Sequence, residues 1–122
     1  LPSGEKISDI LIKIQHTKLL GIILSCISPE NYELNLNEIK NLGIPFGFKL
    51  NAFIRTNPKP NYTGAYQKSK TGNPNEFLGQ RKDLTPEKMA NFVKKFKDNG
   101  ATILGGCCET RPDHIKKMSE LI

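Results

Sequence analysis

The sequence predicts an α/β fold in which parallel strands alternate with helices. Three short apolar stretches have the character of buried strands, and the segments around them carry apolar residues at helical spacing. Two of the predicted helices begin with Ser or Thr followed by Pro and Glu, a typical helix start. The predicted order is helix, strand, helix, strand, long loop, helix, strand, helix, and strands joined by helical crossovers form a parallel sheet.

The first half of the chain supplies two helices and one strand. Ser3 can cap a first helix whose apolar residues form one stripe: Ile7, Ile10, Leu11 and Ile14. The run 19–26 is nearly continuous in apolar residues, as expected of a strand buried on both faces. Ser28-Pro29-Glu30 then supplies an N-cap, a proline at the first helical position and an acid in the first turn. The helix that follows ends at Gly43 and carries Leu36, Ile39 and Leu42.

The middle of the chain combines a second strand with a long segment that has no periodicity. The strand is predicted over 46–53 and is entered through Pro45. The segment 54–84 is rich in Asn, Pro, Lys and Gly, and loops of that length are either functional or disordered. Its Tyr62 and Tyr66 either line a site or are ordinary loop aromatics.

The last part repeats the helix–strand–helix pattern. Thr85-Pro86-Glu87 opens a helix that ends at Asn99-Gly100 and has one apolar stripe: Met89, Phe92, Val93 and Phe96. A strand then leads into Cys108. Thr110-Arg111-Pro112-Asp113 predicts a capping-box start for a final helix with Ile115, Met118 and Ile122.

Composition excludes several classes of partner. The net charge of +6 is carried almost wholly by lysines scattered along the chain, because arginine occurs only at Arg55, Arg81 and Arg111. Nucleic-acid readout favours clustered arginine and interleaved aromatics, so no nucleic-acid partner is expected. Mean hydropathy is −0.43 and no apolar run approaches a membrane span of ~18 residues, so no membrane association is expected. No secretion signal is recognisable, and a cytoplasmic protein is predicted.

The three cysteines are the most specific chemical feature. Their odd number and the adjacency of Cys107 and Cys108 argue against a disulfide framework. Cys107 and Cys108 follow Gly105-Gly106 at the end of a predicted strand, and Cys26 ends an earlier one. Three thiolates would leave a zinc ion one open coordination position, which distinguishes a catalytic zinc from a structural one. The alternative is that these cysteines are small buried hydrophobes.

The predicted sheet is small for an independent domain. A parallel sheet of three strands has two unpaired edges, and such edges are normally covered or paired. The first residue is Leu rather than Met, which fits a processed protein or a fragment. We therefore expect the chain to be part of a larger structure.

Several motifs together resemble the homocysteine S-methyltransferase family. The run 100–108, followed by Pro112-Asp113-His114-Ile115, closely resembles the closing signature of that family. Cys26 resembles its first zinc ligand, Leu50-Asn51-Ala52 its Pro-Asn-Ala segment, and Thr85-Pro86-Glu87 its usual helix opening. The resemblance covers essentially the whole chain.

The resemblance implies a fold and an activity. The family fold is a (β/α)8 TIM barrel of ~250 residues or more, so residues 1–122 are expected to be its C-terminal portion, about strands six to eight, with the N-terminal portion absent. Zn²⁺ held by Cys26, Cys107 and Cys108 would activate the homocysteine thiol for SN2 attack on a methyl group, forming methionine. The donor would be a small molecule or a methylated corrinoid. The resemblance leaves the oligomeric state of the full-length protein open, a homo-oligomer included.

The resemblance also points to residues around the metal. Gly105 and Gly106 are expected to let the backbone turn tightly, so that both neighbouring cysteines reach one metal. Asn51 is expected either to contact substrate or to be a turn former at the strand end. Ser25 and Glu109 stand where the family usually has Asn and Gly, and they are expected to affect the substrate site.

Two alternatives remain open at this point. One is a non-catalytic zinc-binding or redox protein whose site is closed by a fourth protein ligand such as His114. The other is an inactive truncated product.

Overall fold

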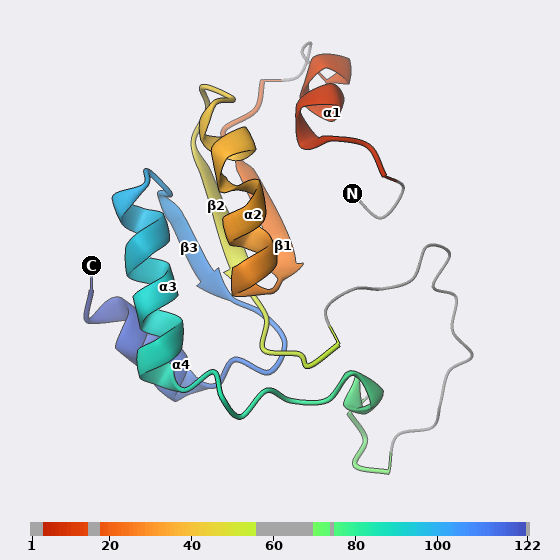
Figure 1. Ribbon diagram of the computed structural model, residues 1–122, viewed down its shortest axis with the longest axis vertical. Helices are drawn as coiled ribbons and strands as arrows, with labels where there is room; N and C mark the ends of the chain where they lie inside the picture. Colours follow the sequence, from red (N-terminus) through yellow and green to blue (C-terminus); the bar gives the residue numbers. More distant parts are fainter. Residues whose placement is uncertain (1–3, 15–17, 56–69, 74, 122) are drawn as a thin grey trace.

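The elements follow one another in the predicted order. The structure is a computed structural model that describes residues 4–14, 18–55, 70–73 and 75–121. Its elements are shown in Figure 1: α1 (Ile7–Lys13), β1 (Ile22–Ile27), α2 (Pro29–Lys40), β2 (Phe46–Leu50), the 3-10 helix η1 (Glu76–Leu78), α3 (Pro86–Asp98), β3 (Ile103–Gly106) and α4 (Pro112–Ser119).

The strands form the predicted parallel sheet. Their order is β1-β2-β3, so that β2 lies between β1, which contains Cys26, and β3, which leads into Cys107. Ser25 pairs with Lys49, and Lys49 pairs with Gly105 across the sheet. The register between β1 and β2 shifts between Ser25 and Ile27, which leaves Cys26 outside the ladder. The α/β class with a parallel sheet is therefore confirmed.

Helices α2 and α3 cover one face of the sheet, and α4 packs on α3 (Figure 1). The centre of this core is a cluster of three fully buried rings from α2, β2 and α3. Tyr32 lies 5.0 Å from Phe48 and 4.7 Å from Phe96, measured between ring centroids, and Phe48 lies 5.5 Å from Phe96. Tilted and edge-on ring pairs at these separations are favourable beyond the area that they bury.

The other face of the sheet has no covering layer among the described residues. Ile23 on β1 is 43% exposed and Lys49 on β2 is exposed, whereas their neighbours Phe48 and Leu50 are fully buried. The expectation that the first strand is buried on both faces is therefore wrong for the described residues. The strand also begins at Ile22 rather than Leu19, and Leu20, which precedes it, is 93% exposed.

The starts of α2 and α3 agree with the sequence, whereas that of α4 does not. The Ser28 hydroxyl accepts the backbone N–H of Asn31, and the Thr85 hydroxyl accepts that of Lys88, each at 3.3 Å. At α4 the N-cap residue is Arg111, whose backbone N–H is accepted by Nδ1 of His114. Thr110 does not cap the helix, because its hydroxyl donates to the Cys107 carbonyl instead. No described helix is long and apolar enough to cross a membrane.

The second strand is shorter than predicted because the chain changes direction at Asn51. β2 ends at Leu50, and the chain beyond it pairs with residues 78–81 at the other end of the long segment. Phe53 and Gln80 form an antiparallel bridge, and the Arg81 N–H donates to the Ala52 carbonyl at 2.8 Å. Four residues named above lie outside the described residues: Ser3, Tyr62, Tyr66 and Ile122.

Candidate metal centre

The three cysteine sulfurs converge at the carboxyl end of the sheet. Cys26 comes from the end of β1, whereas Cys107 and Cys108 follow β3 on the other side of β2. The three Sγ atoms all lie within 4.8 Å of one another, and those of Cys107 and Cys108 are 3.9 Å apart. Residues 81 positions apart in the sequence thus share one site.

Cys26 adopts an unusual backbone conformation. Its φ is 55°, in the left-handed region that side chains other than glycine rarely adopt. The register shift at this position frees its carbonyl from the ladder, and that carbonyl accepts Nδ2 of Asn51 at 2.6 Å. A β-bulge of this kind commonly re-aims a side chain next to a functional site.

The cysteine pair is held by the end of β2. The Cys107 N–H donates to the Leu50 carbonyl at 2.7 Å, and the Cys108 carbonyl accepts the Ala52 N–H at 3.0 Å. Both cysteines are half-buried, whereas Cys26 is exposed. The middle strand supplies no sulfur but makes backbone contacts with the pair.

The sulfur cluster fits a zinc ion. Tetrahedral coordination with Zn–S bonds of about 2.3 Å separates sulfur ligands by about 3.8 Å, close to the separation of the adjacent pair. Thiolates are preferred ligands of zinc, and three of them leave one position for another ligand. Among the described residues, the cluster of possible metal ligands contains only these three cysteines.

The electrostatics of the pair also favour a bound cation. Burial disfavours the Cys107 thiolate, but hydrogen bonds from Cys26 and Cys108 outweigh it and lower the pKa of Cys107. Burial, together with hydrogen bonding and repulsion from Cys26 and Cys107, raises the pKa of Cys108 to about 12. A bound cation would compensate the repulsion between neighbouring thiolates and favour their charged form.

The glycines before the pair do not form the expected tight turn. Gly105 and Gly106 are strand residues of β3, and neither has a positive φ. The left-handed residues at the site are Cys26 and Glu109 instead. Gly106 is required by close packing, because a Cβ there would lie 2.4 Å from the Thr110 hydroxyl oxygen.

Glu109 is joined to the long segment rather than to the sulfur cluster. Its carboxylate accepts Nδ2 of Asn73 at 2.9 Å and Nη2 of Arg111 at 3.2 Å, and its side chain is 11% exposed. Its φ of 62° gives a physical reason for glycine at this position. Sequence reasoning missed Asn73, which carries no local signal.

Ser25 and Asn51 lie on opposite sides of Cys26. Ser25 is exposed on the uncovered face of the sheet, one residue before Cys26. Asn51 is buried, with 4% of its surface exposed, and both atoms of its side-chain amide are engaged by the protein. The structure therefore brings the Asn51 amide into hydrogen-bond contact with Cys26.

His114 has no free ring nitrogen. Its Nδ1 accepts the Arg111 N–H at 3.0 Å, so the tautomer that satisfies both contacts donates Nε2–H to the Leu84 carbonyl at 2.9 Å. The ring is buried, and its bond to Leu84 joins the start of α4 to the segment before α3. This arrangement disfavours a site closed by His114.

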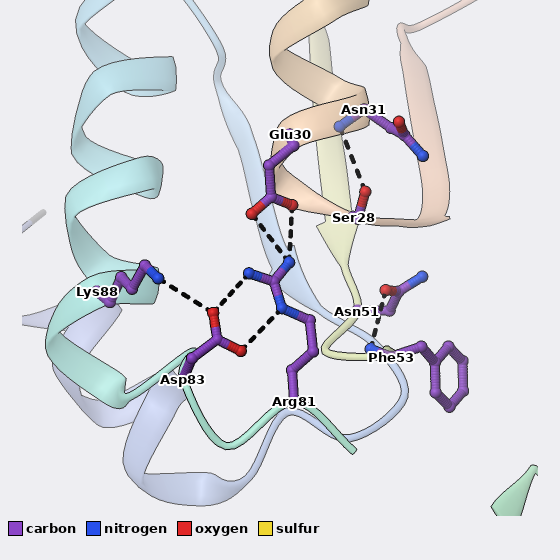
Figure 2. A network of polar contacts seen from close by, with 8 residues as sticks. All are labelled: Ser28, Glu30, Asn31, Asn51, Phe53, Arg81, Asp83 and Lys88. Carbon is purple, nitrogen blue, oxygen red and sulfur yellow. Dashed lines mark hydrogen bonds and ion pairs between the residues drawn. The ribbon is translucent and has the colours of Figure 1, made fainter. Parts of the chain in front are cut away.

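An ion-pair network beside the centre connects α2 with the segment before α3. Figure 2 shows Arg81 between two carboxylates. Nη1 of Arg81 lies 2.8 Å from an oxygen of Glu30, and Nε and Nη2 donate to Asp83 at 3.1 and 2.8 Å. Lys88 donates to the same Asp83 carboxylate at 3.1 Å. Sequence reasoning used Arg81 only in the charge argument, and no local pattern indicates its partner Glu30.

A parallel α/β sheet with three convergent thiols at its carboxyl end defines a protein with a candidate metal centre. The sequence model of the homocysteine S-methyltransferase family matches residues 1–122. The chain therefore belongs to the homocysteine S-methyltransferase family.

Curated relatives match shorter segments. A selenocysteine methyltransferase from Astragalus bisulcatus is 36% identical over 44 residues, which cover 36% of this chain and 13% of that protein. Homocysteine S-methyltransferase 1 of Saccharomyces cerevisiae is 40% identical over 50 residues, which cover 41% of this chain and 15% of that protein. The matched segments span a small part of either relative.

Proposed function

We propose that this chain is the zinc-binding, C-terminal portion of a (β/α)8-barrel enzyme that methylates the thiol of homocysteine to form methionine. The observation that carries the proposal is the convergence of three cysteine sulfurs within 4.8 Å in a chain of this family. Their position at the carboxyl ends of parallel strands supports it, because barrel enzymes place their active sites there. The selenocysteine methyltransferase among the relatives extends the acceptor class to selenols.

The residues have distinct roles in the proposed reaction. Cys26, Cys107 and Cys108 would hold the zinc and leave one position for the substrate sulfur. Bound zinc would supply Lewis acidity that keeps a thiol deprotonated near neutral pH. The substrate thiolate attacks the methyl carbon of the donor, so that one S–C bond forms while the bond to the donor breaks. The end of β2 keeps the cysteines in place through Leu50 and Ala52.

Sulfur counting on the metal tests the proposal. X-ray absorption of the zinc-loaded full-length protein is expected to show three sulfur ligands, rising to four with homocysteine. Cys26→Ala is expected to lose one sulfur and to weaken zinc binding. A protein-only shell that homocysteine does not enter would support the non-catalytic alternative and contradict the proposed function.

The barrel has its own test. The uncovered sheet face and the two edge strands support the proposal that further strands complete the sheet. Residues 1–122 expressed alone are expected to unfold without a cooperative transition, whereas the full-length protein unfolds cooperatively. A sharp transition in the isolated segment would contradict this assignment.

A further inference from the structure

Asn51 lies between the β-bulge that contains Cys26 and the segment after β3 that contains Cys107 and Cys108. It follows β2, the middle strand, and its side chain is buried. Nδ2 donates to the Cys26 carbonyl at 2.6 Å and lies 3.7 Å from the Cys26 sulfur. Oδ1 accepts the Phe53 N–H at 3.3 Å, which fixes the orientation of the amide. Both ends of the amide are thus occupied by the protein.

Cys26 depends on support from outside its own strand. A left-handed conformation is unfavourable for a residue with a side chain, and it persists only where its surroundings enforce it. The ladder passes from the Ser25–Lys49 pair directly to the Ile27–Leu50 pair, so Cys26 has no paired residue on β2. The Asn51 side chain supplies the donor that the ladder lacks.

The backbone of Asn51 secures the next residue. Its N–H donates to the Ile27 carbonyl at 2.8 Å, while its neighbours Leu50 and Ala52 bond to Cys107 and Cys108. Three consecutive residues at and just after the end of β2, Leu50 to Ala52, therefore bond to the backbone on both sides of the sulfur cluster. Only the contact to Cys26 itself is made by a side chain and can be removed by substitution.

We infer that Asn51 is a positioning residue. It holds the backbone of Cys26 in its left-handed conformation and thereby directs the Cys26 sulfur toward Cys107 and Cys108. The inference rests on the proposed function in so far as these sulfurs bind zinc. It differs from the substrate contact expected from the sequence, because the nitrogen and the oxygen of the amide each bond within the protein.

Asn51→Asp tests this role in the full-length protein. Aspartate is nearly isosteric and keeps a side-chain oxygen, but it lacks the N–H donor and faces the Cys26 carbonyl with a negative charge. We expect zinc affinity, measured by competition with a chromophoric chelator, to fall about tenfold or more. The Co²⁺-loaded variant is expected to lose part of its sulfur-to-cobalt charge-transfer absorption, and the same loss is expected of Cys26→Ala. Unchanged affinity and an unchanged spectrum would overturn the inference. That result would be expected if Asn51 acted only through its side-chain oxygen, on the metal or on substrate, because aspartate keeps that oxygen.

A measurement without metal separates this inference from the proposed function. In the metal-free protein, diamide oxidation of Cys26 with Cys107 or Cys108, followed by peptide mass spectrometry, reports how closely the sulfurs approach. The rate of this cross-link is expected to fall in Asn51→Asp and, less strongly, in Asn51→Ala, which serves if the first variant fails to fold. An equal rate in both variants and the wild type would overturn the inference. Absence of zinc binding by the wild type would overturn the proposed function but leave this reading intact.

Asn35→Asp is the matched control. The Asn35 amide also donates to a backbone carbonyl, that of Asn31 at 2.7 Å, but it lies within α2. Its substitution is expected to leave zinc affinity, the Co²⁺ spectrum and the cross-linking rate unchanged. Equal losses in Asn35→Asp and Asn51→Asp would show a general effect of the new charge and overturn the specific role.

Discussion

Arg81 and Glu30, 51 positions apart in the sequence, form an ion pair in which Nη1 of Arg81 lies 2.9 and 2.8 Å from the two carboxylate oxygens. The pair joins the first turn of α2 to the segment that returns toward α3. The backbone of Arg81 also donates to the Ala52 carbonyl at 2.8 Å, so the same residue reaches the end of β2. Arg81 therefore connects parts of the chain that the sheet alone does not hold together.

Arg81→Met is expected to destabilise the protein. The Arg81 side chain is only 17% exposed and bonds to two carboxylates, so its loss is expected to lower the free energy of unfolding by about 1–2 kcal/mol. Urea unfolding measures the change. Lys94→Met removes an ion pair whose partners are 60% and 58% exposed, and it is expected to cost below about 0.5 kcal/mol. Equal effects would contradict the prediction.

The contribution of Asp83 is expected to disappear in acid. Hydrogen bonds from Arg81 and Lys88 hold the pKa of the Asp83 carboxyl well below its usual range. A pKa that is lower in the folded state gives stability that is present above the unfolded value of about 3.9 and is lost as pH falls below it. The difference in urea midpoint between wild type and Asp83→Asn should therefore be largest near pH 7 and shrink progressively as pH falls below about 4. A difference independent of pH would argue against this coupling.

Gly105→Ala and Gly106→Ala are expected to differ. A Cβ at Gly106 would lie 2.4 Å from the Thr110 hydroxyl oxygen and 2.7 Å from Cδ1 of Ile115, whereas one at Gly105 meets ordinary contacts at 3.6 Å. Overpacking of this kind costs about 1–3 kcal/mol, so Gly106→Ala should lower the thermal midpoint and Gly105→Ala should leave it nearly unchanged. The opposite ranking would contradict the packing described at β3.

Tyr32→Phe is expected to stabilise the protein. The Tyr32 hydroxyl is buried in the aromatic cluster and has no hydrogen-bond partner among the described residues. Removing an unpaired buried hydroxyl should raise the free energy of unfolding by about 1 kcal/mol. Burial raises the pKa of Tyr32 to about 12, so the unfolded wild type ionises first, and the advantage of Tyr32→Phe should grow above pH 10. A loss of stability in the variant would show that the hydroxyl is satisfied.

Local sequence signals predicted the elements, whereas tertiary contacts set their limits. The caps Ser28 and Thr85 define helix starts through bonds to residues three positions away, which sequence spacing reveals. β2 ends at Leu50 because the next residues bond to other segments, and no local pattern encodes those partners. Thr110 fits a capping pattern, yet its hydroxyl binds the Cys107 carbonyl.

The candidate site was predictable in its sulfurs but not in its support. Strand ends and the parallel arrangement place Cys26 near Cys107 and Cys108, and the structure brings all three sulfurs together. The left-handed conformation of Cys26 and its contact with Asn51 depend on a register shift, and no residue in the sequence indicates that shift. Whether Ser25 and Glu109 act on a substrate stays a prediction.

The order β1-β2-β3 gives the sulfur cluster a topological consequence. A cation that joins Cys26 to Cys107 closes a loop in the chain that spans residues 26–107, and this loop contains the long segment and the helices α2, η1 and α3. A cross-link of that span would lower the entropy of the unfolded chain by an amount worth about 4.5 kcal/mol if it behaved like a disulfide. Under the proposed function, the same ion would activate the substrate thiol and would also hold two non-adjacent strands at a fixed distance. A chelator would therefore abolish activity and lower the free energy of unfolding together.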